Sequence, residues 1–139
     1  MTDGSDVSVE IRWPDVDAYG HVSHIALIGI AEHARSRWLD SLLEVTPDTW
    51  PYVVVHLNVD FRAPATFADR TVRARLQPTH VGRSSVRLDE TLSAPDGRVL
   101  AQFETVIVAW DESGSASRRL TPQEADRLAQ EAAQSGNAR

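Results

Sequence analysis

The sequence predicts a small domain of the α+β class, in which a five-stranded antiparallel sheet wraps around one long helix and a short helix follows. Its length of 139 residues suits a single hydrophobic core. Segment 23–43 repeats apolar residues with a helical period, whereas the segments on either side alternate apolar and polar residues as strands do. The composition, 42% hydrophobic and 24% charged, is that of a globular protein.

The first expected strand holds Val7, Val9, Ile11 and Trp13, which alternate with polar residues. Pro14 ends this strand, and the polar segment 15–20 is expected to be a loop.

The long helix is expected over residues 23–43, and Pro47 and Pro51 bracket its exit loop. A helix with so broad an apolar face should be mostly enclosed. Its expected apolar stripe consists of Ile28, Ala31, Arg35, Trp38 and Leu42, widened by Ile25, Ile30 and Leu39.

Four further strands are expected at 53–61, 72–78, 86–92 and 99–110. The turn sequence Ala-Pro-Asp-Gly at 94–97 predicts a hairpin between the last two. The last strand is apolar on both faces, which is typical of the centre of a sheet.

The C-terminal part begins with a Ser/Gly-rich linker at 112–119. Thr121 and Glu124 form a capping box that opens a polar helix ending at about Gln134, and 135–139 are expected to fray. We therefore divide the chain into a domain at 1–120 and a C-terminal helix and tail at 121–139.

Composition excludes several classes of function. The net charge of −6 and the pI near 5.3 argue against binding to nucleic acid or to an anionic membrane. All 14 basic residues are arginine, which excludes a Schiff-base or P-loop lysine. Without cysteine the chain has no thiolate nucleophile, disulfide or cysteine-ligated metal. The polar N-terminus is not a signal peptide and no stretch is long enough to span a bilayer, so we expect a cytoplasmic protein.

A single sheet of this kind leaves open edges and cannot cover all of its helix. We therefore expect a homodimer that forms edge to edge, with further pairing into a dimer of dimers.

The segment RWPDVDAYGHV at 12–22, followed by EHAR at 32–35, resembles the opening of the 4-hydroxybenzoyl-CoA thioesterase family. The similarity continues through 58–64, 82–85 and 106–110. This resemblance implies the hotdog fold, an acyl-CoA substrate, thioester hydrolysis and no cofactor.

The sequence departs from the family pattern beside the expected acyl pocket. Ser23 and His24 stand where many relatives have two asparagines, and Leu27 and Ile30 stand where relatives tend to have tyrosines.

By this resemblance Asp17 matches the catalytic aspartate of the family, which acts as a nucleophile or a general base. Thioester hydrolysis requires such a group, and the sequence has no Gly-x-Ser-x-Gly elbow for a serine nucleophile. The alternative is that Asp17 only caps a turn. Asp15 is expected to be a structural acceptor in the loop.

The resemblance also implies that the backbone N–H of His24 stabilises the oxyanion, because the first turn of a helix leaves its N–H groups without partners. Gly20 would allow a sharp turn and a close approach of the substrate, and His21 would line the pocket. A metal site formed by the two histidines with Asp15 and Asp17 is the less favoured interpretation, and we expect no metal.

Further substrate contacts are expected from Glu32 and from Arg83, Ser84 and Ser85. Glu32 matches a glutamate near the family's pocket, although a helix-side ion pair with Arg35 is an equal alternative. Arginine suits phosphate, and the segment 82–85 matches the family's nucleotide end. Arg62 is interpreted as a surface residue.

Two other functions remain open from the sequence. A non-catalytic acyl-CoA-binding protein is compatible with the departures at Ser23, His24, Leu27 and Ile30. A hotdog hydratase or dehydratase is disfavoured, since the Asp-x4-His signature of that class is absent.

Overall fold

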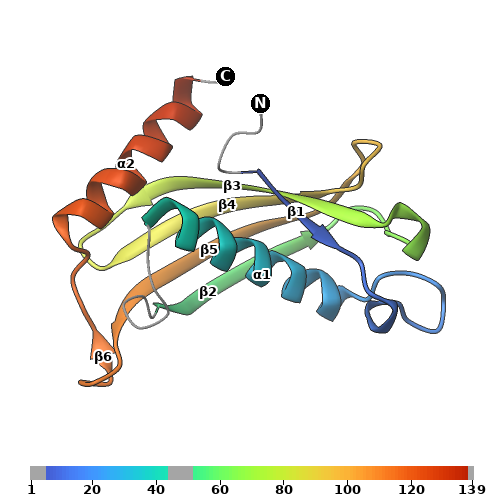
Figure 1. The fold of residues 1–139 in the computed structure, drawn as a ribbon, viewed down its shortest axis with the longest axis horizontal. Coiled ribbons are helices and arrows are strands. Elements are labelled where there is room, and N and C mark those ends of the chain that lie inside the picture. The colour runs from blue at the N-terminus through green and yellow to red at the C-terminus, as the bar shows by residue number, and fades with distance from the viewer. Residues whose placement is uncertain (1–5, 44–51, 138–139) are drawn as a thin grey trace.

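The computed structural model describes residues 6–43 and 52–137 and contains one curved antiparallel sheet with two helices (Figure 1). The strands are β1 (Asp6–Glu10), β2 (Tyr52–Phe61), β3 (Thr71–Val81), β4 (Ser85–Ser93), β5 (Val99–Asp111) and the two-residue β6 (Ala116–Ser117). The helices are α1 (His24–Leu43) and α2 (Pro122–Asn137), with 3-10 turns η1 (Trp13–Asp15) and η2 (Phe67–Asp69).

The strand order is β1-β3-β4-β5-β2, with β6 paired to the end of β5. Every pairing is antiparallel, as expected, so β1 and β2 are the edge strands. The expected loop between α1 and β2, with Pro47 and Pro51, lies outside the described residues. The expected central place of the last strand is observed, because β5 lies between β4 and β2.

Helix α1 lies against one face of the sheet and packs on β1 and β3 (Figure 1). Its apolar stripe is rotated from the expected one, because Ile25 is 70% exposed and Ile28 only partly buried. The helix is therefore not enclosed on the side that faces β2. Its buried residues are Leu27, Ile30, Ala31, Ala34, Arg35, Trp38 and Leu39.

The first strand ends earlier than expected, at Glu10 rather than Trp13. The chain then turns into η1, because the Asp15 carboxylate accepts a hydrogen bond from the Arg12 N–H at 2.8 Å. Trp13 consequently points outward and packs edge-on against Phe67, with ring centroids 5.5 Å apart.

The C-terminal helix α2 packs against β3, and its Leu128 is fully buried in the common core. The capping box is present, since Glu124 N–H donates to the Thr121 hydroxyl and Thr121 N–H to the Glu124 carboxylate. Burial raises the pKa of Glu124, and hydrogen bonds from Arg118 and Thr121 lower it by more. The helix extends to Asn137, beyond the expected end, and the expected linker contains β6.

Candidate active site

The loop before α1 folds back on itself like a small hairpin. Val16 and Val22 pair as an isolated β-bridge, and Asp17 N–H donates to the His21 carbonyl at 2.8 Å. The turn closes with Gly20 N–H donating to the Asp17 carbonyl at 3.1 Å. Gly20 has φ +82°, a left-handed conformation that favours glycine. Asp17, Gly20 and His21 are therefore brought together in one exposed turn.

The Asp17 carboxylate is exposed and has two different oxygens. Its Oδ1 accepts hydrogen bonds from Tyr19 N–H at 2.9 Å and from His21 N–H at 3.1 Å. No described residue donates to Oδ2. The side chain therefore organises the loop through Oδ1, and its Oδ2 is exposed.

The N-terminus of α1 lies beside this turn. Ser23 is the N-cap, because its hydroxyl accepts the Ala26 N–H at 3.0 Å, while its own N–H donates to the Asp15 carbonyl at 2.9 Å. Within the described part of the chain, nothing accepts a hydrogen bond from the N–H of His24 or Ile25. These two donors stand at the positive end of the helix dipole and can stabilise developing negative charge.

The His24 side chain lies on the β2 side of the helix. Its ring packs edge-on against Phe61, with centroids 6.0 Å apart, so the start of α1 contacts the end of β2.

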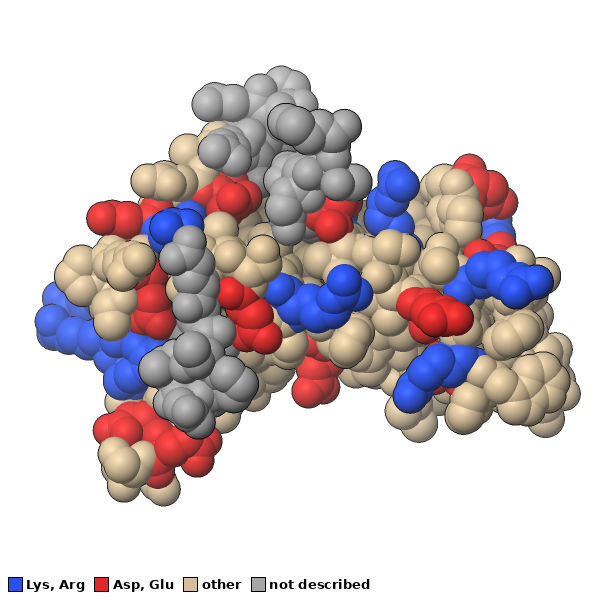
Figure 2. Space-filling model, viewed as in Figure 1, with Lys and Arg blue, Asp and Glu red and all other residues tan. Residues whose placement is uncertain are grey.

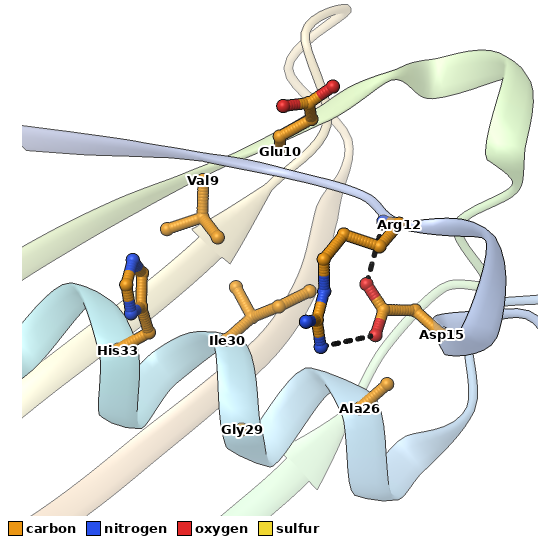
Figure 3. A pocket seen from close by; sticks show the side chains of 8 residues that line it. All are labelled: Val9, Glu10, Arg12, Asp15, Ala26, Gly29, Ile30 and His33. Carbon is orange, nitrogen blue, oxygen red and sulfur yellow. Dashed lines mark hydrogen bonds and ion pairs between the residues drawn. The ribbon is translucent and has the colours of Figure 1, made fainter.

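A cleft of about 450 Å³ lies on the opposite side of α1, between the helix and β1 (Figure 3). Asp15 forms one wall with Arg12, whose Nη2 is 3.5 Å from Oδ1. Asp15 is thus a structural acceptor in the loop. The cleft is lined by Val9, Glu10, Arg12, Asp15, Ala26, Gly29, Ile30 and His33, and Asp17 is not among them.

Glu32 is exposed on α1, eight residues beyond His24, and does not form the considered ion pair with Arg35. Arg35 instead binds Glu90 of β4 with two hydrogen bonds, of 2.6 and 2.8 Å. This buried pair was not anticipated from the sequence. The sequence signal for this pair is that Arg35 and Glu90 each occupy an apolar position, Arg35 in the stripe of the helix and Glu90 in the alternating pattern of its strand.

The residues expected to bind phosphate lie at the other end of the sheet, in the β3–β4 hairpin (Figure 1). Ser85 pairs with Val108 of β5, whereas Phe61 beside His24 pairs with Ala101. Seven residues of strand separate these levels, which corresponds to about 23 Å. The structure therefore does not bring Arg83, Ser84 and Ser85 together with Asp17 in one chain.

The hairpin presents Arg83 to solvent on a fixed backbone. The Arg83 carbonyl accepts Leu120 N–H at 2.8 Å, and the Ser84 carbonyl accepts Ala109 N–H at 2.9 Å. The Arg83 side chain is exposed and has no acidic partner in the described ranges. In the view of Figure 2, acidic and basic side chains are interspersed over the surface.

In residues 6–43 and 52–137, no three histidine or acidic side chains are close enough to hold a metal ion. None of the helices described is long and apolar enough to cross a membrane.

Comparisons with known proteins indicate what the chain is similar to. Residues 11–130 match the model of the thioesterase-like superfamily. The chain is 29% identical over 107 residues to the long-chain acyl-CoA thioesterase FadM of Escherichia coli, covering 74% of this chain and 80% of that protein.

Two solved structures illustrate the similarity in fold. A Thermus thermophilus thioesterase in complex with coenzyme A and zinc superposes with a TM-score of 0.77 at 24% identity, over 94% of this chain and 95% of that one. A 1,4-dihydroxy-2-naphthoyl-CoA thioesterase from Synechocystis gives 0.77 at 19% identity, over 89% and 94%. These likenesses confirm the expected fold class.

Proposed function

The chain belongs to the thioesterase-like superfamily, and on that basis we propose that it hydrolyses an acyl-CoA thioester to a free acid and coenzyme A. Thioester hydrolysis is the activity shared by its named relatives. The acyl-CoA substrate and the role of Asp17 are specific to this proposal.

The observation that carries the proposal is the pairing of an exposed carboxylate with unpartnered N–H groups at the start of α1. A thioester carbonyl that accepts the His24 N–H would be polarised by the helix terminus. Asp17 Oδ2 then removes a proton from a water that attacks the carbonyl carbon, or attacks that carbon itself to give an acyl-aspartyl anhydride that water hydrolyses in a second step. In either case the carbon–sulfur bond breaks, the thiolate of coenzyme A takes up the proton that the water loses, and the acyl group is released as the free acid.

A second copy of the chain completes the site in this proposal. The inward-facing side chains of β2 are uncovered, with Val54 43%, Leu57 38% and Phe61 47% exposed, and β2 is an open sheet edge. Antiparallel pairing of two β2 strands about a two-fold axis would cover this face and join the sheets into a homodimer, which can pair again.

The same pairing would place the β3–β4 hairpin of the partner at the end that carries Asp17 and His24. Arg83, Ser84 and Ser85 of the partner subunit would then bind the phosphates of the coenzyme A, while Gly20, His21 and Glu32 contact the acyl end of the substrate.

Residues 1–120 would form the hotdog unit and 121–139 an appended helix and tail. A cytoplasmic location is part of the same proposal.

The test is a panel of aliphatic and aromatic acyl-CoA thioesters, assayed for release of free thiol. We expect catalytic release from at least one class. Saturable binding of acyl-CoA without thiol release would contradict hydrolysis and favour the non-catalytic alternative.

A further inference from the structure

Three consecutive residues in the middle of α1 bind three different strands. Arg35 binds Glu90 of β4, the Ser36 hydroxyl lies 2.9 Å from that of Tyr52 in β2, and Arg37 Nη1 donates to the Ser8 carbonyl of β1 at 3.0 Å. Successive residues on a helix point about 100° apart. These bonds therefore connect one level of the helix with the centre and both edges of the sheet.

The Arg35 bond is the buried member of this set. Its Nε donates to Glu90 Oε2 at 2.6 Å and its Nη2 to Oε1 at 2.8 Å, while the Thr105 hydroxyl donates to the same Oε1 at 2.8 Å. The side chains of Arg35 and Glu90 are 3% and 0% exposed. Burial lowers the pKa of Arg35, but the hydrogen bond and charge of Glu90 raise it by more, so the guanidinium stays charged.

A buried pair of this kind adds little net stability, because the desolvation of two charges offsets their attraction. Apolar side chains of similar volume in its place are often neutral or stabilising. Apolar burial is not directional, whereas a bidentate arginine–carboxylate pair tolerates only small displacements. The distinctive contribution of the pair is therefore geometric.

The N-terminal half of α1 lacks such bonds. From His24 to Ala34, no side chain in the described structure hydrogen-bonds to the sheet. Apolar side chains hold this half against the sheet, and the directional bonds next to it in the described structure are the cap at Ser23 and the bonds at 35–37. Arg35 lies eleven residues, or about 17 Å, beyond His24 on the same rigid helix.

We propose that Arg35, held by Glu90 and Thr105, is a positioning residue that sets where α1 lies along the sheet and thus where the His24 N–H meets the thioester carbonyl. This inference rests on the proposed function. An oxyanion donor acts within a few tenths of an ångström, and a misplacement of about 1 Å can cost up to 100-fold in rate.

The test replaces the whole cluster with apolar residues of similar size, as Arg35→Met/Glu90→Met/Thr105→Val. We expect a folded protein with a Tm equal to or above that of the wild type. We expect kcat to fall about 10-fold with KM unchanged, because the donor contributes to the transition state and the coenzyme binds elsewhere. The amide resonance of His24 in a ¹⁵N–¹H NMR spectrum should also shift.

The matched control is Arg87→Gln/Glu104→Gln, which removes an exposed pair of 3.6 Å between the same two strands, β4 and β5. It should leave both kcat and the His24 resonance unchanged. If the triple variant does not fold, Thr105→Val tests the contribution of Thr105, because it removes the bond to Glu90 Oε1 and keeps the Arg35 pair. In that variant kcat should still fall, by less than in the triple variant, and Thr105→Ser should keep the wild-type kcat because it keeps the hydroxyl.

Wild-type kcat together with an unmoved His24 resonance in the folded variant would overturn the inference. A wild-type protein that hydrolyses no acyl-CoA would refute the proposed function instead, and the NMR shift would still test the positioning.

Discussion

The two ends of the sheet carry different chemistry. One end has the carboxylate of Asp17 and, at the start of α1, two backbone N–H groups without a partner among the described residues. The other end has the exposed Arg83 and two serines on a braced hairpin. The first set suits the polarisation and attack of a carbonyl, and the second suits the binding of phosphate.

The strand levels beside these two sets, at Phe61 and Ser85, lie about 23 Å apart, so within one chain the sets stand at opposite ends of the sheet. In the proposed antiparallel dimer, the chemical end of each subunit would lie beside the proposed phosphate-binding end of the other. The predictions below test whether the two ends have these separate roles and whether they act across subunits.

The largest effect is expected at the chemical end, from Asp17→Asn. The asparagine oxygen can still accept the N–H groups of Tyr19 and His21, so the loop should keep its shape. The variant has no carboxylate to act as base or nucleophile, and kcat should fall about 100-fold or more with folding and acyl-CoA binding largely intact.

Steady-state kinetics and thermal unfolding check this prediction, with Asp15→Asn as the control that acts mainly through stability. An Asp17→Asn enzyme as fast as the wild type would disprove the mechanism. A variant that simply unfolds would support a purely structural role for Asp17.

Mixing two impaired variants tests whether the ends act across subunits. A heterodimer of Asp17→Asn and Arg83→Ala chains has one site with both changes and one with neither. Random exchange should therefore restore about one quarter of the wild-type activity at low substrate concentration. No recovery, despite mixed dimers detected by native mass spectrometry, would place both residues in the site of one subunit.

The chemical end was more predictable from the sequence than its relation to the phosphate end. The loop around Asp17 and the N-cap before His24 depend on local signals, a glycine and a capping serine, which lie next to each other in the chain. The distance between Asp17 and Arg83 depends on strand order and length. Periodicity gives the strands but not the order in which they pair.

Other differences have the same physical origin. The helical period predicts Ile25 on the apolar stripe, yet the helix packs on β1 and β3 and leaves this residue exposed. The bond between Arg35 and Glu90 joins residues 55 positions apart, and no local pattern encodes such a partner.

At the phosphate end, Arg83→Ala should raise KM for acyl-CoA by about 10- to 150-fold, which corresponds to a charge-assisted hydrogen bond of about 1.5–3 kcal/mol. It should barely affect a truncated pantetheine thioester, which lacks the nucleotide. Arg73→Ala, which removes another exposed arginine, is the control and should change neither KM. Equal losses on the two substrates would refute a phosphate contact.

The smallest effects are expected from the glycines, which shape the two turns for different reasons. Gly20 has φ +82° with open space around a Cβ, so Gly20→Ala should cost about 1 kcal/mol of unfolding free energy through backbone strain alone.

Gly82 does not have a left-handed φ, but a Cβ at this position would lie 2.8 Å from Ser85 Oγ. Gly82→Ala should therefore cost less, because a hydroxyl can rotate away. The measurement is chemical denaturation of Gly82→Ala in a Ser85→Ala background. Removal of the hydroxyl should abolish the loss of unfolding free energy caused by Gly82→Ala. The Gly20 cost should be the same in that background, and a Gly82 cost that persists would mean that its turn too is limited by the backbone.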